Sequence, residues 1–463
     1  MDYDLIVIGG GAAGLGAAEA AAATGARTLL VADGEIGGEC TFTGCVPSKT
    51  LIEAAARGAS FAEATAAVRT AVAAIAATET PEVLSRRGIE VLRGRAAFAA
   101  PHQITVDRRS LHARAFVVAT GSHPAVPPLP GLAPQHGGEA VPYLTNETVF
   151  ELTELPASLA ILGGGAVGCE LAQAFRRFGT EVTIVEAADR LLPAADPEAS
   201  RVVEQVLRAD GISVRTSAEA RSVQPNERGV ALALSGGKQV VAQHLLVATG
   251  RQPATEHLDL GAARVTVDQR SHIRVDKHLA TSAPGVYAAG DVTGQMPFTH
   301  AAYTMGRLAA RNALRRRHER PSVFDTAAIP WVVFTSPEVA QVALTGQQSA
   351  AHPGARVAYL PMGELDRAIT ARRTDGFIKL IAGPRKLLGN AGGGRVLGAT
   401  IVAERAGEMI HEPALAIRAG MFTGRLAQTV HAYPSWSMAV QQAAAQFFGT
   451  YGGRTAHPAG RAP

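Results

Sequence analysis

Residues 5–14 read LIVIGGGAAG, an apolar run that leads directly into a glycine-rich turn. An alanine-rich stretch follows and ends near Gly25. This order of strand, tight turn and helix is typical of a dinucleotide fingerprint, because glycines let the backbone approach a pyrophosphate and the helix N-terminus attracts its charge. We therefore expect a nucleotide-binding domain to begin here, with Gly9, Gly11 and Gly14 at the cofactor.

The next apolar run, residues 28–31, ends where a carboxylate that binds the ribose is expected. Ala32 stands at that position and Asp33 follows it. We expect Asp33 to bind the ribose if the register of the strand allows it.

Residues 159–168, LAILGGGAVG, repeat the pattern and lead into a stretch with helical character up to Gly179. A second dinucleotide is therefore expected at Gly163, Gly165 and Gly168.

Residues 181–185 form the next expected strand, and Glu186 closes it about 20 residues beyond the glycines. An acid at that place hydrogen-bonds the adenosine ribose 2′-hydroxyl and repels a 2′-phosphate. The position favours NADH over NADPH, while Arg190 nearby leaves NADPH open.

Two further runs, residues 118–121 (VATG) and 247–251 (VATGR), read as apolar strands that end in small-residue turns. They are expected to close the two nucleotide domains in parallel fashion, with Thr120, Gly121 and Gly250 at the cofactors.

Residues 285–291, GVYAAGD, again deliver an acid at the carboxyl end of a strand. Asp291 suits the hydroxyl-rich ribityl chain of a flavin. It also suits the N-cap of a helix, and the two roles are compatible.

Residues 37–49, GGECTFTGCVPSK, place Cys40 and Cys45 with four residues between them. The spacing alone allows two buried thiols or half of a metal site. The remaining cysteine, Cys169, lies inside the second glycine motif, so four-thiolate zinc is excluded, and no histidine clusters with the pair. We expect no metal. Because a dinucleotide fingerprint lies just upstream, the pair suggests a redox-active dithiol against a bound flavin, with Gly38 at the cofactor.

Residues 46–48, Val-Pro-Ser, indicate the start of a helix, because proline is favoured in the first helical turn. Cys45 is then expected near the positive helix end. A thiolate needs such an environment, or a nearby cation, to lower its pKa.

The composition is that of an ordinary globular protein: 463 residues, 47% hydrophobic, 18% charged and a formal charge of +4. The length predicts about three domains. So small a charge implies neither nucleic acid nor an anionic membrane as a partner. Glycines and charges interrupt every apolar stretch, and the acidic residues 1–4 lead directly into a strand. We therefore expect no membrane span, no signal peptide and a cytoplasmic location.

The cysteine stretch, the two glycine fingerprints, the two ATG turns and the Ala-Gly-Asp strand occur here in one order. In this the chain resembles the pyridine nucleotide-disulfide oxidoreductases, and within that family the dihydrolipoamide dehydrogenases and mercuric reductases. The resemblance covers nearly the whole chain.

The resemblance implies an α/β fold with two Rossmann-like domains, for FAD and NAD(P)H, and a C-terminal α+β dimerisation domain. Residues 330–340 (PWVVFTSPEVA) look like the opening of that last domain, so a homodimer is implied. The expected divisions are an FAD domain in two parts, an NAD(P)H domain and an interface domain: residues 1–148, 269–326, 149–268 and 327–463.

By the same resemblance, hydride passes from the nicotinamide to FAD, and the reduced flavin opens a disulfide between Cys40 and Cys45. Cys45 would be the thiolate next to the flavin, and Cys40 the thiol that attacks the substrate. Lys49 would lie beside the flavin N5 and pair with Glu170, since a buried lysine needs such a partner to stay charged. A solvent-exposed Lys49 is the alternative.

The C-terminal segment departs from the family pattern. Disulfide reductases of this kind present a His-Pro pair and a nearby Glu from the other subunit, but here Tyr433 and Met438 take the histidine and glutamate positions. Loss of such a base would cost roughly 10² to 10⁴ in proton transfer to and from a dithiol. Mercuric reductases lack that histidine too, but carry a vicinal cysteine pair near the tail, and residues 452–457 hold no cysteine.

Two residues are expected to compensate. Tyr433 itself is a candidate proton donor, and His431 is a candidate if an extended segment brings it to the same side. For His431 a purely structural role, satisfying backbone groups, is the alternative.

The sequence thus predicts an FAD enzyme that uses NADH, or NADPH, to reduce a small-molecule disulfide or another thiol-reactive acceptor at Cys40 and Cys45. Two other functions stay open. The flavin could pass electrons directly to quinones or oxygen as a diaphorase does, or the dithiol could be a redox sensor that hardly turns over.

Overall fold

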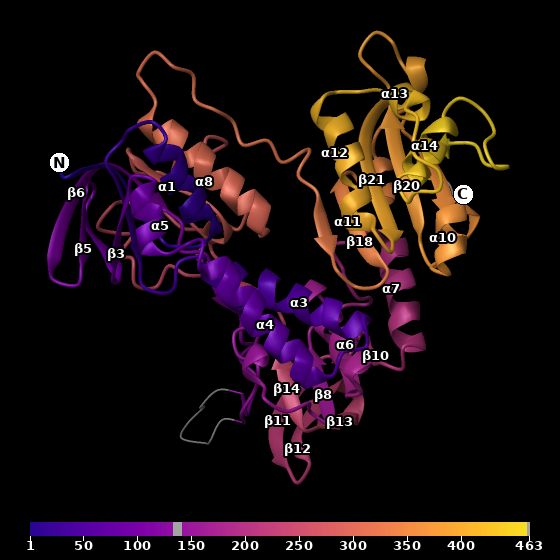
Figure 1. Ribbon diagram of the computed structural model, residues 1–463, viewed down its shortest axis with the longest axis horizontal. Helices are drawn as coiled ribbons and strands as arrows, with labels where there is room; N and C mark the ends of the chain where they lie inside the picture. Colours follow the sequence, from indigo (N-terminus) through magenta and orange to yellow (C-terminus); the bar gives the residue numbers. More distant parts are fainter. Residues whose placement is uncertain (133–140, 461–463) are drawn as a thin grey trace. The chain divides into compact units, whose positions relative to one another are not determined.

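Figure 1 shows the computed structural model, which describes residues 1–132 and 141–460. The chain divides into two compact units. The first unit comprises Met1–Pro128, Tyr143–Leu155 and Leu246–Asp325. The second comprises Leu129–Pro142, Pro156–Leu245 and Thr326–Pro463.

The first unit contains a seven-stranded sheet in the order β3-β2-β1-β6-β5-β4, with β16 also paired to β6. Strands β1, β2, β3, β6 and β16 run parallel, and β4 and β5 extend the sheet as an antiparallel hairpin. Its strands are β1 (Tyr3–Ile8), β2 (Thr28–Ala32), β3 (Ile89–Arg93), β4 (Ala96–Ala100), β5 (Gln103–Val106), β6 (Arg109–Val118) and β16 (Val286–Ala288). β1 is nearly all apolar because a central parallel strand is covered on both faces.

Helices α1 and α8 lie side by side in the first unit (Figure 1). They approach so closely that a Cβ on Gly306 would lie 1.9 Å from the carbonyl oxygen of Ala13. The other elements of this unit are a short two-stranded sheet and the helices around the cysteines. The elements are α1 (Ala12–Ala22), α2 (Gly38–Phe42), α3 (Cys45–Ala56), α4 (Phe61–Ala76), α5 (Pro81–Arg86), α8 (Thr299–Leu314), β7 (Ser122–Pro124) and β15 (Arg251–Pro253).

The second unit contains the other nucleotide-type sheet, in the order β10-β9-β8-β14, and a three-stranded antiparallel sheet. β8, β9 and β10 are parallel. The unit boundary falls within β14. The elements are β8 (Ser158–Leu162), α6 (Ala166–Phe178), β9 (Glu181–Val185), α7 (Pro197–Ala209), β10 (Ser213–Arg215), β11 (Ala220–Asn226), β12 (Gly229–Leu234), β13 (Gln239–Ala242) and β14 (His244–Val247).

The C-terminal part of the second unit is an antiparallel sheet in the order β17-β18-β21-β20-β19-β22, with helices packed on a buried apolar core. Its strands are β17 (Trp331–Val333), β18 (Glu338–Ala343), β19 (Arg356–Pro361), β20 (Phe377–Gly383), β21 (Arg395–Ala403) and β22 (His457–Pro458). Its helices are α9 (Gly346–Ser349), α10 (Asp366–Ala371), α11 (Ala406–Met409), α12 (His411–Arg418), α13 (Thr423–Gln428) and α14 (Met438–Ala445).

Residues Phe61–Arg86 are the one described helical stretch with the length and hydropathy of a membrane span. It is not one continuous rod, because α4 ends at Ala76 and α5 begins at Pro81, each with its own N-cap, Ser60 and Thr80. With 16 residues, α4 is shorter than the roughly 20 needed to span a bilayer.

Glu338 at the start of β18 has an unusual environment for a carboxylate. Its Oε2 accepts a hydrogen bond of 2.8 Å from the backbone N–H of Gly407. Burial raises its pKa from the ordinary 4.5 to about 7; Gly407 and Arg405 oppose this, and Glu404 and Glu408 reinforce it. Since the folded-state pKa lies above the unfolded one, the folded state binds the extra proton between these values.

We predict that Glu338→Gln will flatten the pH dependence of stability. In the native protein the protonated carboxyl makes its full contribution to the free energy of unfolding below the pKa that Glu338 has in the unfolded chain. That contribution is lost as the pH rises through about 7. At about pH 8 the variant should therefore be more stable than the native protein, by at most about 3 kcal/mol. Urea unfolding at about pH 5 and about pH 8, at one protein concentration, measures this. Identical pH slopes for both proteins would contradict the role of Glu338.

Candidate active site

Two short helices position the cysteine pair. Cys40 lies within α2, and Cys45 is the first residue of α3, so the start of a helix expected after Cys45 is confirmed one residue earlier. The two side chains are hydrogen-bonded to each other. Cys45 Sγ also lies 3.4 Å from Thr299 Oγ1, on α8. Because Cys45 sits at a helix N-terminus, the backbone there favours negative charge on its sulfur.

The hydrogen bond with Cys45, followed by burial, raises the pKa of the Cys40 thiol, and Thr299 opposes the shift. All three cysteines are free thiols in this structure. In the reduced pair, Cys40 therefore retains its proton strongly.

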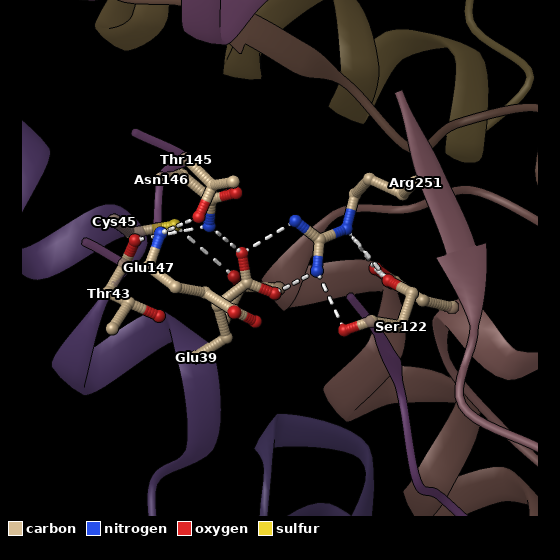
Figure 2. A network of polar contacts seen from close by, with 10 residues as sticks. Glu39, Thr43, Cys45, Ser122, Thr145, Asn146, Glu147 and Arg251 are labelled. Carbon is tan, nitrogen blue, oxygen red and sulfur yellow. Dashed lines mark hydrogen bonds and ion pairs between the residues drawn. The ribbon is translucent and has the colours of Figure 1, made fainter. Parts of the chain in front are cut away.

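Glu39, which directly precedes Cys40, is tied to Arg251 at the start of β15 (Figure 2). Arg251 Nη1 donates to Glu39 Oε1 at 2.6 Å, and Nη2 donates to Oε2. Asn146 Nδ2 donates to the same Oε1 at 2.6 Å and to the carbonyl oxygen of Thr43 at 3.4 Å. These contacts fix the chain at Glu39, just before Cys40, and at Thr43, between the two cysteines.

The same arginine reaches Asp291. Arg251 Nε donates to Ser122 Oγ at 2.7 Å, and Ser122 Oγ donates to Asp291 Oδ2 at 2.7 Å. Arg251 Nε lies 3.5 Å from that carboxylate oxygen. Burial raises the pKa of Glu39, and the ion pair with Arg251 opposes that rise.

Sequence reasoning did not select Glu39, Ser122, Asn146 or Arg251 as site residues. For Glu39 the sequence held one indication of a role. A charged side chain inside a glycine- and cysteine-rich loop requires a cationic partner if it is buried.

Both glycine fingerprints have the tight turn that a dinucleotide requires. A Cβ on Gly14 would lie 1.8 Å from the carbonyl oxygen of Gly9, and one on Gly168 would lie 2.0 Å from that of Gly163. The helices α1 and α6 begin directly after Gly11 and Gly165, at N-caps that receive no side-chain hydrogen bond from the described residues. Their N-terminal N–H groups are thus available to a pyrophosphate, so both sites fit their expected cofactors.

The two ribose positions differ. At the second fingerprint, Glu186 accepts hydrogen bonds from the backbone N–H groups of Gly164 at 2.6 Å and Ala188 at 2.7 Å. At the first fingerprint, Ala32 takes the position that Glu186 has at the second. A Cβ added to Gly164 would lie 3.1 Å from Glu186 Cβ, and a Cβ added to Gly10, the matching glycine, would lie 3.1 Å from Ala32 Cβ. Asp33 lies one residue further on and is paired with Arg95 at 3.6 Å. Asp33 would have to reach the ribose from there.

The remaining expected cofactor residues lie at strand ends. Thr120 and Gly121 follow β6, and Gly250 lies between β14 and β15. Thr120 Oγ1 donates to the carbonyl oxygen of Ala254 at 2.7 Å. Asp291 begins a short 3₁₀-helix whose N-cap is Gly290, so it is not the cap there. Gly38 begins α2, against Gly11.

Known proteins share the sequence pattern of this chain. Residues 3–306 match the model of the pyridine nucleotide-disulphide oxidoreductases, and residues 329–444 match the dimerisation domain of the same group. The chain belongs to this family.

Its relatives include a mercuric reductase of Streptomyces lividans, 36% identical over 96% of each chain, and a dihydrolipoyl dehydrogenase of Thermus scotoductus, also 36% identical over 96% of each. Among solved structures, the flavoprotein disulfide reductase RclA of Escherichia coli matches with a TM-score of 0.85 at 30% identity, covering 95% of this chain and 98% of that one. LpdA of Mycobacterium tuberculosis matches with a TM-score of 0.85 at 31% identity, covering 96% and 99%.

The expected fold class and enzyme class are confirmed. The protein is an NAD(P)H-dependent FAD disulfide oxidoreductase of the group that includes the dihydrolipoyl dehydrogenases, mercuric reductases and RclA. The matched dimerisation domain implies a homodimer.

Lys49 and Glu170 lie in different units of this oxidoreductase. Lys49 is on α3, and Glu170 is on α6 with only 4% of its surface exposed. Glu170 Oε1 accepts a hydrogen bond of 2.8 Å from the backbone N–H of Phe334. Their pairing stays a prediction.

His431 and Tyr433 both have partners within the second unit. His431 Nε2 lies 3.0 Å from Glu412 Oε2 and Nδ1 lies 2.9 Å from the carbonyl oxygen of Thr429, so both ring nitrogens face acceptors. Tyr433 is largely exposed, and its hydroxyl donates to Asp366 Oδ2 at 2.9 Å, which raises the tyrosine pKa. Tyr433 therefore retains its proton, while His431 is held by its neighbours.

We predict that Arg251→Met will lower the free energy of unfolding by about 2–4 kcal/mol, because it leaves Glu39 half-buried without its cation. The matched control is Arg93→Met, which removes an exposed arginine paired with Glu35 at 2.9 Å. That change should cost no more than about 1 kcal/mol. Urea unfolding of both variants measures the difference.

Adding Glu39→Gln to Arg251→Met should recover part of the loss, since the unpaired charge is then gone. The stabilising role of the Glu39–Arg251 ion pair would be contradicted if both arginine variants lowered the free energy of unfolding by the same small amount. It would also be contradicted if the double variant were no more stable than Arg251→Met.

Proposed function

We propose that this oxidoreductase uses NADH to reduce a small-molecule disulfide through the Cys40–Cys45 pair, in the cytoplasm. The observation that carries the proposal is the hydrogen-bonded pair itself, with Cys45 at a helix N-terminus and Cys40 holding the proton. Such an arrangement places two sulfurs within reach for thiol–disulfide exchange.

The exchange takes two steps. Cys40, once deprotonated, attacks one sulfur of the substrate disulfide, which breaks the substrate S–S bond and releases one thiolate. Cys45 then attacks the sulfur of Cys40, which releases the second thiolate and closes the Cys40–Cys45 bridge. The first released thiolate takes the proton that Cys40 gives up, and the second takes a proton from water. When bound, FAD supplies the electron pair, received from the nicotinamide, that reopens the bridge.

The roles of the remaining residues are part of the proposal. Lys49, supported by Glu170, supplies positive charge at the flavin, and Tyr433 and His431 are the two candidate proton donors. The residues proposed to hold FAD are Gly9, Gly11, Gly14, Asp33, Gly38, Thr120, Gly121 and Asp291. Those proposed to hold NADH are Gly163, Gly165, Gly168, Glu186 and Gly250.

A second function, direct reduction of quinones or oxygen, is favoured by one observation. Tyr433 and Met438 occupy the positions of the proton-transferring dyad, which makes a dithiol substrate harder to serve. The related proteins include a mercuric reductase and a Cu(II) complex of RclA, so thiol-reactive metal ions join the acceptors to be tested. Within the described residues, no three His, Cys, Asp or Glu side chains are grouped to hold a metal.

Cys40→Ser separates these functions. We expect the variant to lose NADH-dependent disulfide reduction by at least about 10³, because no other thiol can attack the substrate. NADH-dependent quinone reduction by the same preparation should stay within about twofold of the native rate and serves as the internal control. Rapid quinone reduction by the native protein without measurable disulfide turnover would establish the diaphorase instead. No NADH consumption with any acceptor would favour the redox sensor.

The choice of NADH depends on Glu186. We predict that Glu186→Ala will lower the ratio of kcat/KM for NADH to that for NADPH by about tenfold, because the acid no longer repels a 2′-phosphate. Glu181→Ala, an exposed acid at the other end of β9, is the matched control. An unchanged ratio in Glu186→Ala would show that Glu186 does not set the preference for NADH.

A further inference from the structure

A cavity of about 640 Å³ in the first unit is lined by both redox cysteines. Its walls come from α1, α2, the first residue of α3, residues 78–87 and α8. A volume of this size suits a small organic molecule. Because Cys40 and Cys45 face it, it is the natural place for the acceptor of the proposed disulfide reductase.

The lining holds two carboxylates, Glu19 and Glu79, one arginine, Arg87, and one histidine, His300, so the carboxylates outnumber the arginine. Arg87 Nη1 lies 2.6 Å from Glu19 Oε1, and the hydroxyl of Tyr303 donates to Glu19 Oε2 at 2.7 Å. The arginine at the end of α5 is thereby paired with an acid on α1. Glu79 is the remaining carboxylate of the lining.

Glu79 is hydrogen-bonded to α2, the helix that holds Cys40. The hydroxyl of Thr41, the residue after Cys40, donates to Glu79 Oε2 at 3.1 Å. Burial raises the pKa of Glu79, Glu19 adds to the rise, and Thr41 and Arg87 oppose it. A carboxylate in such a place gains from a cation that enters the cavity.

We propose that this cavity binds small disulfides that carry positive charge, and that Glu79 selects them over neutral and anionic ones. This inference rests on the proposed disulfide reductase function and names its substrate class. An ammonium group a few atoms from the disulfide would reach Glu79 while one sulfur meets Cys40. An acidic disulfide would place its carboxylate against Glu79 instead, and like charges at close range are unfavourable.

Three disulfides of similar length test the proposal in steady state: cystamine, a dication; bis(2-hydroxyethyl) disulfide, which is neutral; and dithiodiglycolate, a dianion. At low salt we expect kcat/KM for cystamine to exceed that for dithiodiglycolate by about tenfold or more, and the gap to narrow as salt is added. Dithiodiglycolate reduced as well as cystamine would overturn the proposal.

Glu79→Gln should lower kcat/KM for cystamine by about tenfold and change that for the neutral disulfide by less than about twofold. The matched control is Glu82→Gln, which removes an exposed acid at the start of α5 outside the cavity lining. It should leave all three values unchanged. An equal loss for all three disulfides in Glu79→Gln would indicate a structural role and overturn the selection.

A second measurement needs no turnover. In Cys45→Ser protein, Cys40 is allowed to react with two methanethiosulfonates, one that carries an ammonium group and one that carries a sulfonate group. The ratio of the two reaction rates is compared with the same ratio for a small free thiol. We expect the ammonium reagent to be favoured over the sulfonate by about tenfold beyond the free-thiol ratio, and Glu79→Gln to remove that preference. Equal normalised rates would overturn the proposal.

If the native protein reduces none of the three disulfides but still reduces quinones, the proposed disulfide function is wrong, and the substrate class falls with it. If it reduces them without regard to charge, only the role of Glu79 is wrong.

Discussion

The ion pair between Glu39 and Arg251 is the contact on which the redox loop depends. Glu39 adjoins Cys40, and its half-buried carboxylate would favour the neutral form without a cation. A guanidinium suits this place because its planar set of N–H donors satisfies both carboxylate oxygens and Ser122 at once. Through Ser122 the same side chain reaches Asp291. One arginine therefore connects the cysteine loop with the acid expected at the flavin.

Fixing this loop has chemical consequences for the two thiols. Asn146 holds the carbonyl oxygen of Thr43 as well as Glu39, so the chain is anchored just before Cys40 and again between Cys40 and Cys45. The sulfurs remain within hydrogen-bonding distance in the open form, and little movement is needed to close the bridge. Cys45 at a helix start is suited to negative charge, and Cys40, which faces the cavity, keeps the proton. Each sulfur thus has a separate task before any acceptor arrives.

Local sequence signals predicted local structure well. The apolar runs and glycines gave β1 with α1 and β8 with α6, and the strand expected over residues 181–185 is β9. Contacts between distant segments could not be predicted in this way. Glu39 and Arg251 are 212 positions apart, and Glu79 reaches Thr41 across 38 residues, so nothing in either local pattern names the partner. The residue at the ribose of the first nucleotide was also hard to predict from the sequence. A shift of one residue in the end of the strand decides whether Ala32 or Asp33 takes that position.

The most direct test of the central claim is to map alkylated cysteines by mass spectrometry before and after anaerobic addition of NADH to the air-oxidised holoenzyme. We expect Cys40 and Cys45 to resist iodoacetamide before NADH and to be labelled together after it. Cys169, which is fully buried, should stay unlabelled throughout and provides the internal control. Labelling of Cys40 and Cys45 that does not depend on NADH would contradict an electron path through this pair.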